Sequence, residues 1–372
     1  MTVYKILVIN PGSTSTKVAI YEDERLDFES TIEHSTEELS EFERVIDQLE
    51  YRENLISNVL KEKNYELKEF SAIACRGGLI GPVESGTYLV DETMVYALRN
   101  SKVEHASNLA GLIGYSIAKK IGVNAYITDP VSVDEMEEIA RISGVKDIER
   151  KSYSHALNLK AVARKAELEL DQKYENMNLV IVHLGGGISI SAHRKGKMVD
   201  VNNANDEGPF SPERAGELPV GDVIRMAYSG KYSARELKKR YVGHGGLVAY
   251  LGTNDLRKAM ELSQKDPKAS LIVKAMAYQI AKGIAEMYVV LNGKVDAIIL
   301  TGGMAFSSQF VEMIKSYISN LSLVLVIAGG YEMEALAMGA LRVLKGEEKA
   351  KIYTYGVREV KEYGHEKASR AR

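Results

Sequence analysis

The sequence is poor in cysteine, proline and tryptophan. Its 372 residues include one cysteine, Cys75, seven prolines and no tryptophan. A single cysteine excludes an intrachain disulfide and is typical of proteins of a reducing compartment. The apolar run at residues 6–9 is too short for the core of a secretory signal. We therefore expect a cytoplasmic protein.

Neither sign of charge dominates, and long apolar runs are missing. The 48 Lys and Arg residues nearly balance the 51 Asp and Glu residues, which leaves a formal net charge of −3. This balance argues against a nucleic-acid or anionic-membrane scaffold. The most apolar stretches, residues 297–300 and 323–328, have the length of strands, whereas a membrane helix needs roughly 20 apolar residues. We expect no nucleic-acid partner and no membrane partner.

Short β-branched runs alternate with longer segments of helical periodicity. The runs predicted as buried strands are residues 6–9, 72–75, 125–127, 179–182, 297–300 and 323–328. Between them, residues 109–121 carry apolar side chains at helical spacing and stop at Gly122. Residues 270–291 are apolar on nearly every side, which predicts a central, buried helix. The alternation is typical of an α/β fold.

One strand–turn–strand pattern occurs twice, at residues 6–20 and 179–192. The domain-sized spacing indicates two similar halves, and a ligand bound between their turns would lie in an interdomain cleft. We expect an N-terminal domain at residues 1–175, which a C-terminal helix at residues 345–372 would complete. The C-terminal domain is expected at residues 176–344.

The turns of both repeats are rich in glycine, serine and threonine. Such a turn exposes several backbone N–H groups with no side chain in the way, which is what the binding of phosphate oxygens requires. A single turn of this kind is more often only a tight β-hairpin. Two matched turns, together with a third glycine pair at Gly302 and Gly303, favour a nucleotide site. The sequence has neither G-x-x-x-x-G-K-[ST] nor G-x-G-x-x-G between a strand and a helix, so such a site must be built from two hairpins.

These turns resemble motifs of a known superfamily. Residues 10–17 (NPGSTSTK), 183–187 (HLGGG) and 301–303 (TGG) resemble the two phosphate motifs and the adenosine motif of the superfamily of acetate and sugar kinases, heat-shock chaperones and actin. Within it, the chain is similar to the acetokinase family of short-chain carboxylate kinases, and among these to the butyrate kinases. Further matches lie at residues 76–78, 128–130, 153–155 and 332–342, so the resemblance extends over essentially the whole chain.

The resemblance implies an α/β fold of two similar actin-like ATPase domains of the ribonuclease H-like kind, in a homo-oligomer. The implied cofactors are ATP or ADP and Mg²⁺, and the implied reaction is the reversible phosphorylation of butyrate to butyryl phosphate by direct in-line transfer. A carboxylic acid with a pKa near that of Glu, about 4.3, is already ionised at neutral pH, so this nucleophile needs no general base. It needs neutralisation of its own charge and that of the γ-phosphate, by arginines, Mg²⁺ and N–H groups.

Four residues are candidates for catalysis under this resemblance. Arg76 is expected to pair with the substrate carboxylate, because a guanidinium matches a carboxylate bidentately; the alternative is a structural arginine beside a glycine turn. Arg214 and His155 are expected to stabilise the transferring phosphoryl group, although a lone histidine is often structural. Asp129 is expected to bind Mg²⁺ through water or to orient the nucleophile; the alternative is a helix N-cap or a turn aspartate before Pro130.

The remaining candidates bind the nucleotide or the metal. Those expected at the phosphates or at adenosine are Asn10, Gly12, Ser13, Ser15, Lys17, His183, Gly185, Gly186, Gly187, Gly302 and Gly303. Asn10, Asp129 and Glu332 are the candidate metal ligands, with Glu334 as an equal choice for the last. The alternatives are a packed strand residue for His183 and, for Glu332, a first-turn acid that stabilises the helix dipole.

Three other functions use the same architecture. A kinase for another short or branched acid, such as acetate, propionate or isobutyrate, needs only a different acyl pocket. A sugar kinase needs a carboxylate base for the sugar hydroxyl, and Asp129 is the candidate. An actin-like or chaperone-like nucleotide switch needs a partner-binding module, and none is visible in the sequence.

Overall fold

The computed structural model describes residues 3–101 and 104–354, which form two compact units. The first unit is drawn from Met1–Asp134, Arg141–Arg150 and Met333–Arg372, and the second from Glu135–Ala140 and Lys151–Glu332. These limits differ from the predicted domains at three places. Residues 135–140 and 151–175 group with the second unit, and residues 333–344 group with the first.

Where the structure describes the C-terminal segment, at residues 345–354, it does not form the helix expected at residues 345–372. In its described part, residues 345–354, the chain turns and forms the short strand β12 (Lys351–Ile352), while residues 355–372 lie outside the described residues. The turn follows because Gly346, just after helix α13 (Glu332–Leu344), has a φ of 76°, a left-handed conformation that ends helices. β12 then pairs with β5 (Thr87–Leu89), so this segment still completes the first unit.

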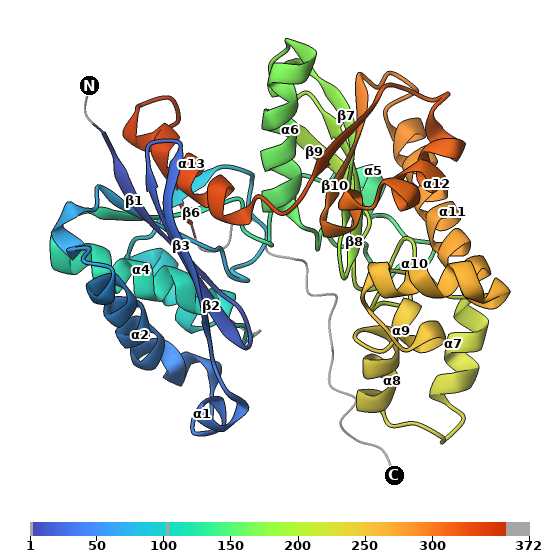
Figure 1. Cartoon of the computed structure of the whole chain (residues 1–372), viewed down its shortest axis with the longest axis horizontal. Coiled ribbons are helices and arrows are strands. Elements are labelled where there is room, and N and C mark those ends of the chain that lie inside the picture. The colour runs from blue at the N-terminus through green and yellow to red at the C-terminus, as the bar shows by residue number, and fades with distance from the viewer. Residues whose placement is uncertain (1–2, 102–103, 355–372) are drawn as a thin grey trace. The chain divides into compact units, whose positions relative to one another are not determined.

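The first unit is built on a seven-stranded sheet with the order β12-β5-β6-β4-β1-β2-β3 (Figure 1). Its remaining strands are β1 (Lys5–Pro11), β2 (Ser15–Glu22), β3 (Arg25–Glu33), β4 (Ala72–Cys75) and β6 (Asn124–Thr128). β1, β2 and β3 form an antiparallel meander. β4 runs parallel to β1 and β6 runs parallel to β4, so the carboxyl ends of these three strands lie at one edge of the sheet.

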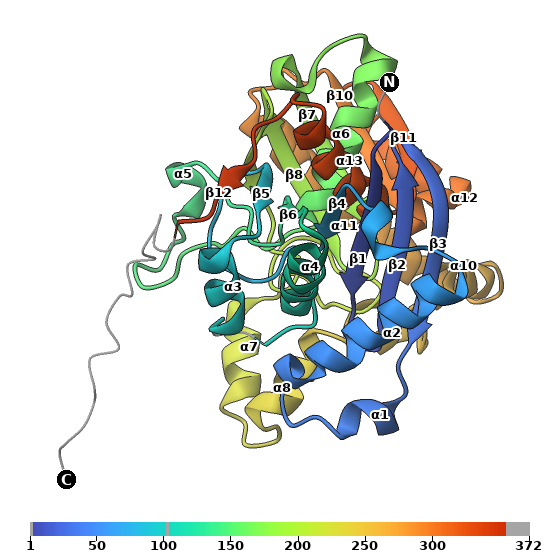
Figure 2. The same cartoon turned by 90° about the vertical axis from the view of Figure 1, so that its left-hand side faces the viewer.

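The two faces of this sheet pack against different helices. Besides α13, the helices of this unit are α1 (Thr36–Ser40), α2 (Leu49–Glu62), α3 (Glu92–Arg99) and α4 (Ser107–Ile121). Ile127 of β6 lies against Gly111 of α4, whereas the next residue, Thr128, lies against Gly339 of α13. Alternate residues of a strand point to opposite faces, so α4 covers one face and α13 the other (Figures 1 and 2). The predicted end of α4 at Gly122 is confirmed, since this glycine has a φ of 75°.

The second unit repeats the central part of this plan. Its five-stranded sheet has the order β11-β10-β7-β8-β9, which matches the order β6-β4-β1-β2-β3 of the first sheet. The strands are β7 (Asn178–Leu184), β8 (Ile188–Arg194), β9 (Lys197–Val201), β10 (Ala297–Gly302) and β11 (Val324–Ala328). Again the first three strands are antiparallel and the other two are parallel to the first. All six predicted strands and both predicted hairpins are therefore present.

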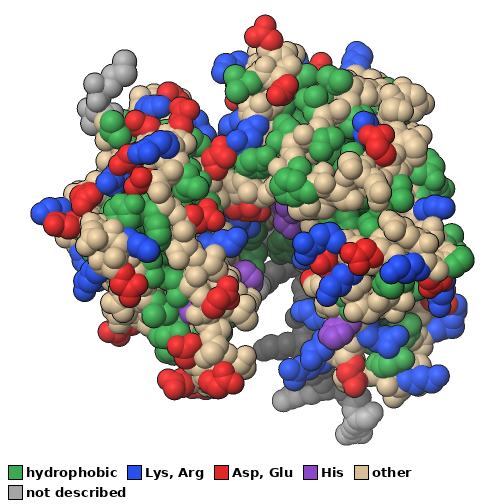
Figure 3. All heavy atoms as spheres, viewed as in Figure 1, with side chains coloured by type: hydrophobic (Ala, Val, Ile, Leu, Met, Phe, Trp, Pro, Cys, Tyr) green, Lys and Arg blue, Asp and Glu red, His purple; other side chains and the backbone are tan. Residues whose placement is uncertain are grey.

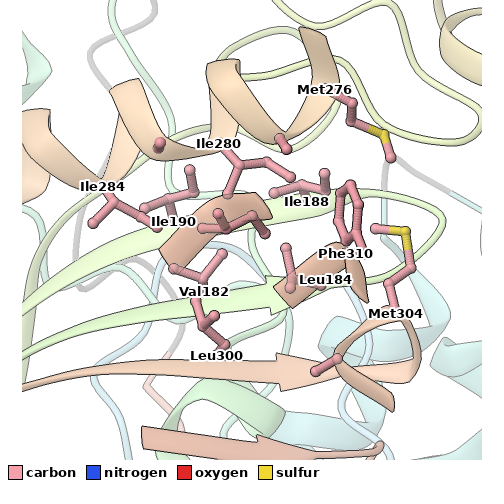
Figure 4. Packing of buried hydrophobic residues seen from close by; sticks show 14 of the residues in the cluster. Val182, Leu184, Ile188, Ile190, Met276, Ile280, Ile284, Leu300, Met304 and Phe310 are labelled. Carbon is pink, nitrogen blue, oxygen red and sulfur yellow. The ribbon is translucent and has the colours of Figure 1, made fainter. Parts of the chain in front are cut away.

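The helices of the second unit cover both faces of its sheet. They are α5 (Glu138–Arg141, whose last residue belongs to the first unit), α6 (Ala156–Leu170), α7 (Val220–Ala227), α8 (Ala234–Tyr241), α9 (Gly246–Leu251), α10 (Leu256–Lys265), α11 (Pro267–Val290) and α12 (Ser308–Ile318). Figure 4 shows Ile280 and Ile284 of α11 packed on Ile190 and Val182 of the sheet. Helix α6 packs against β7 and β10.

Helix α11 is long and apolar as predicted, but it is not buried on every side. One face packs in the core, whereas Leu271 is 65% exposed and Val289 is 70% exposed. The reason is that α11 lies on one face of a sheet, so its other side has no sheet to cover it. No described helix has the length and apolar character needed to cross a membrane. Basic and acidic side chains occur side by side on the face shown in Figure 3, in keeping with the small net charge.

Candidate functional site

In the first unit, the sequence candidates gather where the parallel strands end. Ile9, Cys75 and Ile127 pair across β1, β4 and β6. Asn10 and Arg76 follow the first two of these residues, and the N–H of Arg76 donates to Ile9 O at 2.9 Å. Loops at the carboxyl ends of parallel strands are where α/β folds bind ligands. The structure thus brings Asn10 and Arg76 to one edge of the sheet.

Asp129 lies at the same edge, directly after β6. Its carboxylate is buried, and Oδ1 accepts hydrogen bonds from Ser85 Oγ at 2.6 Å and from the N–H of Gly86 at 2.8 Å. Its φ of 38° is left-handed, which is strained for a non-glycine residue and is a feature that clusters at functional sites. No helix begins directly after Asp129, since the next described helix starts at Glu138, so the N-cap interpretation is wrong.

The C-terminal segment fixes the loop that contacts Asp129. Lys351 Nζ donates to Ser85 O at 2.7 Å, and Glu348 Oε1 accepts from the N–H of Thr87 at 2.7 Å. These contacts join residues more than 260 positions apart. The sequence carries no local signal for them, and they were not predicted.

Two further residues beside Arg76 were also missed by the sequence prediction. An added Cβ on Gly78 would lie 2.3 Å from Asn108 Oδ1, and this oxygen accepts from the N–H of Leu79 at 2.9 Å. His105 precedes α4, with Nδ1 at 2.7 Å from Ser107 Oγ. Partial desolvation lowers the pKa of His105, and the positive charge of Arg76 lowers it further. The glycine pair after Arg76 indicates a close approach, but it does not reveal the partner.

The first hairpin turn presents its polar residues to solvent. The N–H of Gly12 donates to Ser15 O at 2.7 Å, which closes the turn. Ser13 and Lys17 are exposed, and Lys17 pairs directly across from Asn10. Directly opposite residues of an antiparallel pair share a face of the sheet. Asn10 and Lys17 therefore lie on the same face of this hairpin.

In the second unit, the arginine and the glycine turn that were predicted separately are in contact. An added Cβ on Gly187 would lie 2.2 Å from Arg214 Nη1, so the guanidinium rests on the backbone of the β7–β8 turn. Arg214 Nη1 donates to Ala204 O at 2.9 Å, and Ser211 Oγ donates to Gly186 O at 2.5 Å. Burial lowers the pKa of Arg214, but an arginine stays protonated at neutral pH. A glycine turn with a cation beside it suits an anionic ligand.

The two candidate histidines of this unit stack on one another. The rings of His155 and His183 have centroids 4.0 Å apart and are nearly parallel. His155 Nδ1 lies 2.9 Å from Ser189 Oγ, and His183 Nδ1 lies 2.8 Å from Asn158 Nδ2. An amide N–H₂ can only donate, so a neutral His183 carries its proton on Nε2. That atom lies beside Gly185, where an added Cβ would be 2.8 Å away.

The glycine pair assigned to adenosine adjoins the same turn. Gly302 has a φ of 90°, and an added Cβ would lie 2.4 Å from Leu184 O at the end of β7. Gly303 has open space at the corresponding position. Asn158 was missed by the sequence prediction, yet it is buried and accepts from the N–H of Tyr331 at 2.9 Å while donating to His183. It lies three residues after the matching segment at residues 153–155, but nothing in the sequence singles it out.

The two candidate metal glutamates belong to different units. Glu332 lies over Gly330 in the second unit, where an added Cβ would be 2.6 Å from Glu332 Oε2. Glu334 belongs to the first unit, where burial, aided by the charges of Glu334 and Glu29, raises the pKa of Tyr21 to about 12. No cluster of three metal-binding side chains occurs among the described residues. Mg²⁺ commonly uses one or two carboxylates together with substrate phosphates, so either carboxylate, that of Asp129 or that of Glu332, is of the kind that this ion binds.

The chain is similar to known proteins of one family. The family model described as the acetokinase family matches residues 137–349. A protein of Thermotoga petrophila, named probable butyrate kinase, is 56% identical over 351 residues, which cover 94% of this chain and 98% of that protein. The chain belongs to the acetokinase family.

Solved structures show that the acetokinase fold extends over nearly the whole chain. An acetate kinase from Porphyromonas gingivalis aligns with a TM-score of 0.77 at 19% identity, covering 92% of this chain and 100% of that chain. A propionate kinase from Francisella tularensis aligns with a TM-score of 0.72 at 20% identity, covering 90% and 98%. The predicted actin-like ATPase fold is confirmed.

Proposed function

We propose that this member of the acetokinase family is a carboxylate kinase that reversibly transfers the γ-phosphoryl group of ATP to butyrate. The observation that carries the proposal is the contact of Arg214 with Gly187, beside His155 and His183. It places a half-buried guanidinium on a glycine-rich turn, as the stabilisation of a phosphoryl group requires. The choice of butyrate is supported by the name of the Thermotoga petrophila relative.

The reaction joins two anions, and its main demand is charge neutralisation. A carboxylate oxygen of butyrate attacks the γ-phosphorus, the bond from phosphorus to the β-phosphate oxygen breaks, and ADP leaves. The acid is ionised before it binds, so no proton has to be removed. The transition state is loose, with charge spread over three equatorial oxygens.

We assign the acid to the first unit and the transferring group to the second. Arg76 binds the butyrate carboxylate with two parallel N–H···O bonds. Arg214 and His155 stabilise the equatorial oxygens of the transferring phosphoryl group. The β7–β8 turn, Gly302 and Gly303 bind the nucleotide, and His183 Nε2 donates a hydrogen bond at this turn.

The first hairpin contributes to the same nucleotide. Asn10, Gly12, Ser13, Ser15 and Lys17 are assigned to its β- and γ-phosphates. Asn10, Asp129 and Glu332 are assigned to Mg²⁺, which when bound would neutralise charge on the phosphate oxygens.

Trapping with hydroxylamine tests the proposal. The full chain with ATP, Mg²⁺ and butyrate should form butyryl hydroxamate in proportion to the ADP released. Failure to form a hydroxamate with any short-chain acid would refute the carboxylate kinase. ADP release that depends on a hexose would favour a sugar kinase, and hydrolysis without any acceptor would favour a nucleotide switch.

A further inference from the structure

Arg52 of helix α2 is a buried cation without an acidic partner among the residues that the structure describes. Its side chain is 0% exposed. In the described chain, none of its hydrogen bonds goes to a carboxylate, and no carboxylate lies within ion-pair distance. Its acceptors are Gly12 O (2.9 Å), Ser13 O (3.2 Å), Ser15 O (3.1 Å), Thr16 Oγ1 (2.9 Å) and Gln48 Oε1 (2.9 Å from Nη2 and 3.1 Å from Nε).

Burial of a charge in this position lowers the free energy of unfolding. Burying an ion without a counter-ion is strongly unfavourable, and neutral acceptors repay only part of the cost. Burial accordingly lowers the pKa of the Arg52 guanidinium, which nevertheless stays protonated. A neutral side chain of similar length would avoid this cost, so a use for the charge has to be sought at the turn that it contacts.

The guanidinium fixes the direction of the peptide groups in the first hairpin turn. The carbonyl oxygens of Gly12, Ser13 and Ser15 all point toward it, into the interior of the unit. In a planar trans peptide the N–H points opposite to the preceding C=O, and the described chain has no cis peptide. The N–H groups of Ser13 and Thr14 therefore point outward, and both residues are exposed.

The polar groups around Arg52 keep its surroundings neutral. Thr16 Oγ1 accepts from Arg52, so the hydroxyl of Thr16 can donate to His34 Nε2 at 2.8 Å. Burial lowers the pKa of His34, and Arg52 lowers it further, against a smaller opposite effect of Glu38. His34 therefore stays neutral at neutral pH, and Tyr51 Oη lies 3.4 Å from its other ring nitrogen. The charge beneath the turn remains that of Arg52.

We propose that Arg52 is a positioning residue for phosphate binding at the first hairpin. It binds the carbonyl groups of Gly12, Ser13 and Ser15 so that the N–H groups of Ser13 and Thr14 face a nucleotide phosphate. That phosphate, across the turn, is the missing counter-charge of the buried guanidinium. The inference rests on the proposed function only in taking the anion to be a phosphate of ATP or ADP.

Binding of MgADP to the full chain tests this role without any turnover. Arg52→Gln removes the charge and most of the donors, and we expect its Kd for MgADP, measured by calorimetry, to rise at least tenfold. Arg52→Lys keeps the charge but cannot reach all the carbonyl groups, and should give an intermediate Kd. Arg25→Gln is the matched control, because Arg25 lies exposed on β3 and pairs with Glu22; its Kd should stay within twofold of the wild-type value.

Two further measurements separate positioning from general stability. Millimolar methylguanidinium should lower the Kd of an Arg52→Ala variant toward the wild-type value, while leaving that of Arg25→Gln unchanged. The KM for butyrate should stay within twofold in Arg52→Lys, because we assign the acid to Arg76. An equal loss for acid and nucleotide would indicate a merely structural role and overturn the proposal.

Each outcome decides the matter. A folded Arg52→Gln or Arg52→Lys that binds MgADP as tightly as the wild type overturns the proposal. If Arg52→Gln does not fold, Arg52→Lys decides by the same criterion. If the binding of MgADP depends on Arg52 but the chain forms no hydroxamate, this inference stands and the proposed function fails. If the chain forms butyryl hydroxamate but binds MgADP independently of Arg52, the proposed function stands and this inference fails.

Discussion

The guanidinium of Arg214 packs against Gly187 of the β7–β8 turn, where the absence of a Cβ leaves room for it. Gly187→Ala should displace the guanidinium, because the new Cβ would lie 2.2 Å from Nη1 and the end of a long side chain can move. Loss of a preorganised charge at a transferring group costs roughly 10²-fold in rate. We expect kcat for butyrate phosphorylation to fall by about that factor, with an unchanged circular dichroism spectrum.

A matched glycine variant controls for the Gly187 substitution. Gly144→Ala adds the same methyl group where no heavy atom lies within 4 Å, and it should keep wild-type kcat. Equal kcat values for the Gly187→Ala and wild-type proteins would contradict the role given to Arg214.

Asp129 offers a test of charge at constant shape. Asn tolerates left-handed φ better than most residues and can still accept from Ser85 and Gly86, so Asp129→Asn should keep the turn. We expect a roughly 10²-fold lower kcat that recovers in part as Mg²⁺ is raised, because the lost carboxylate is assigned to the metal. A loss that persists at saturating Mg²⁺, together with phosphorylation of a sugar, would instead identify Asp129 as a general base.

At the residue scale, the sequence could predict side chains that directly follow strands or sit in glycine turns. Arg76 and Asp129 follow short apolar runs, so their meeting at one sheet edge was predictable from parallel pairing. Arg52 and Asn158 were not, because each lies within a helix and acts through hydrogen bonds to distant segments. Local spacing carries no information on such contacts.

At the element scale, helix α4 shows that close packing outweighs intrinsic propensity. Gly114→Ala gains up to about 1 kcal/mol of helix propensity. The new Cβ, however, would lie 2.1 Å from Cys75 Sγ in a buried position, and overpacking costs about 1–3 kcal/mol. We expect net destabilisation and a lower Tm.

Cys75 itself reports the effect of Gly114→Ala. Its thiol is fully buried, and burial raises its pKa, so the native wild type should not react with a disulfide reagent such as DTNB. Gly114→Ala should make this reaction faster. An unchanged Tm with an unreactive thiol would show that α4 moves away from β4 at little cost.

The elements that were predicted correctly share a local cause. β-Branched runs of three to six residues bounded by glycine or polar residues became strands β1, β4, β6, β7, β10 and β11. Strands β5 and β12 were not predicted, because both are very short and their pairing joins Tyr88 to Lys351 across most of the chain. Gly346, which turns the chain before β12, was taken as part of a helix.

At the scale of the whole molecule, two buried histidines set a pH limit on stability. Burial lowers the pKa of His34 and of His193, the latter well below the ordinary value. The unfolded chain takes up protons on these residues near pH 6.5, whereas the folded chain does not. The contribution of these neutral histidines to the free energy of unfolding is therefore fully present above about pH 6.5. This contribution is lost as the pH falls below that value.

Urea unfolding at pH 7.5 and 5.5 measures this loss. We expect a lower midpoint at pH 5.5, with a slope of up to about 1.4 kcal/mol per pH unit for each histidine. His193→Gln should reduce the slope, because His193 is fully buried and lies between Tyr174 and Ser191. A midpoint independent of pH across this range would contradict the prediction.

The repeated plan of two halves was predictable because the same strand–turn–strand pattern occurs twice. The exact division was not, since the chain passes between units four times and α13 groups with the first unit after the second is complete. The grouping of α13 with the first unit depends on packing contacts such as that of Gly339 with Thr128. The local sequence does not predict such contacts.

The most direct test of the proposed function is the rate of acyl phosphate formation for acetate, propionate, butyrate and valerate, with ATP and Mg²⁺. We predict measurable turnover for short-chain acids, with the highest kcat/KM for butyrate. A maximum at another acid would correct the substrate but keep the carboxylate kinase. Absence of acyl phosphate with all four acids would contradict the account.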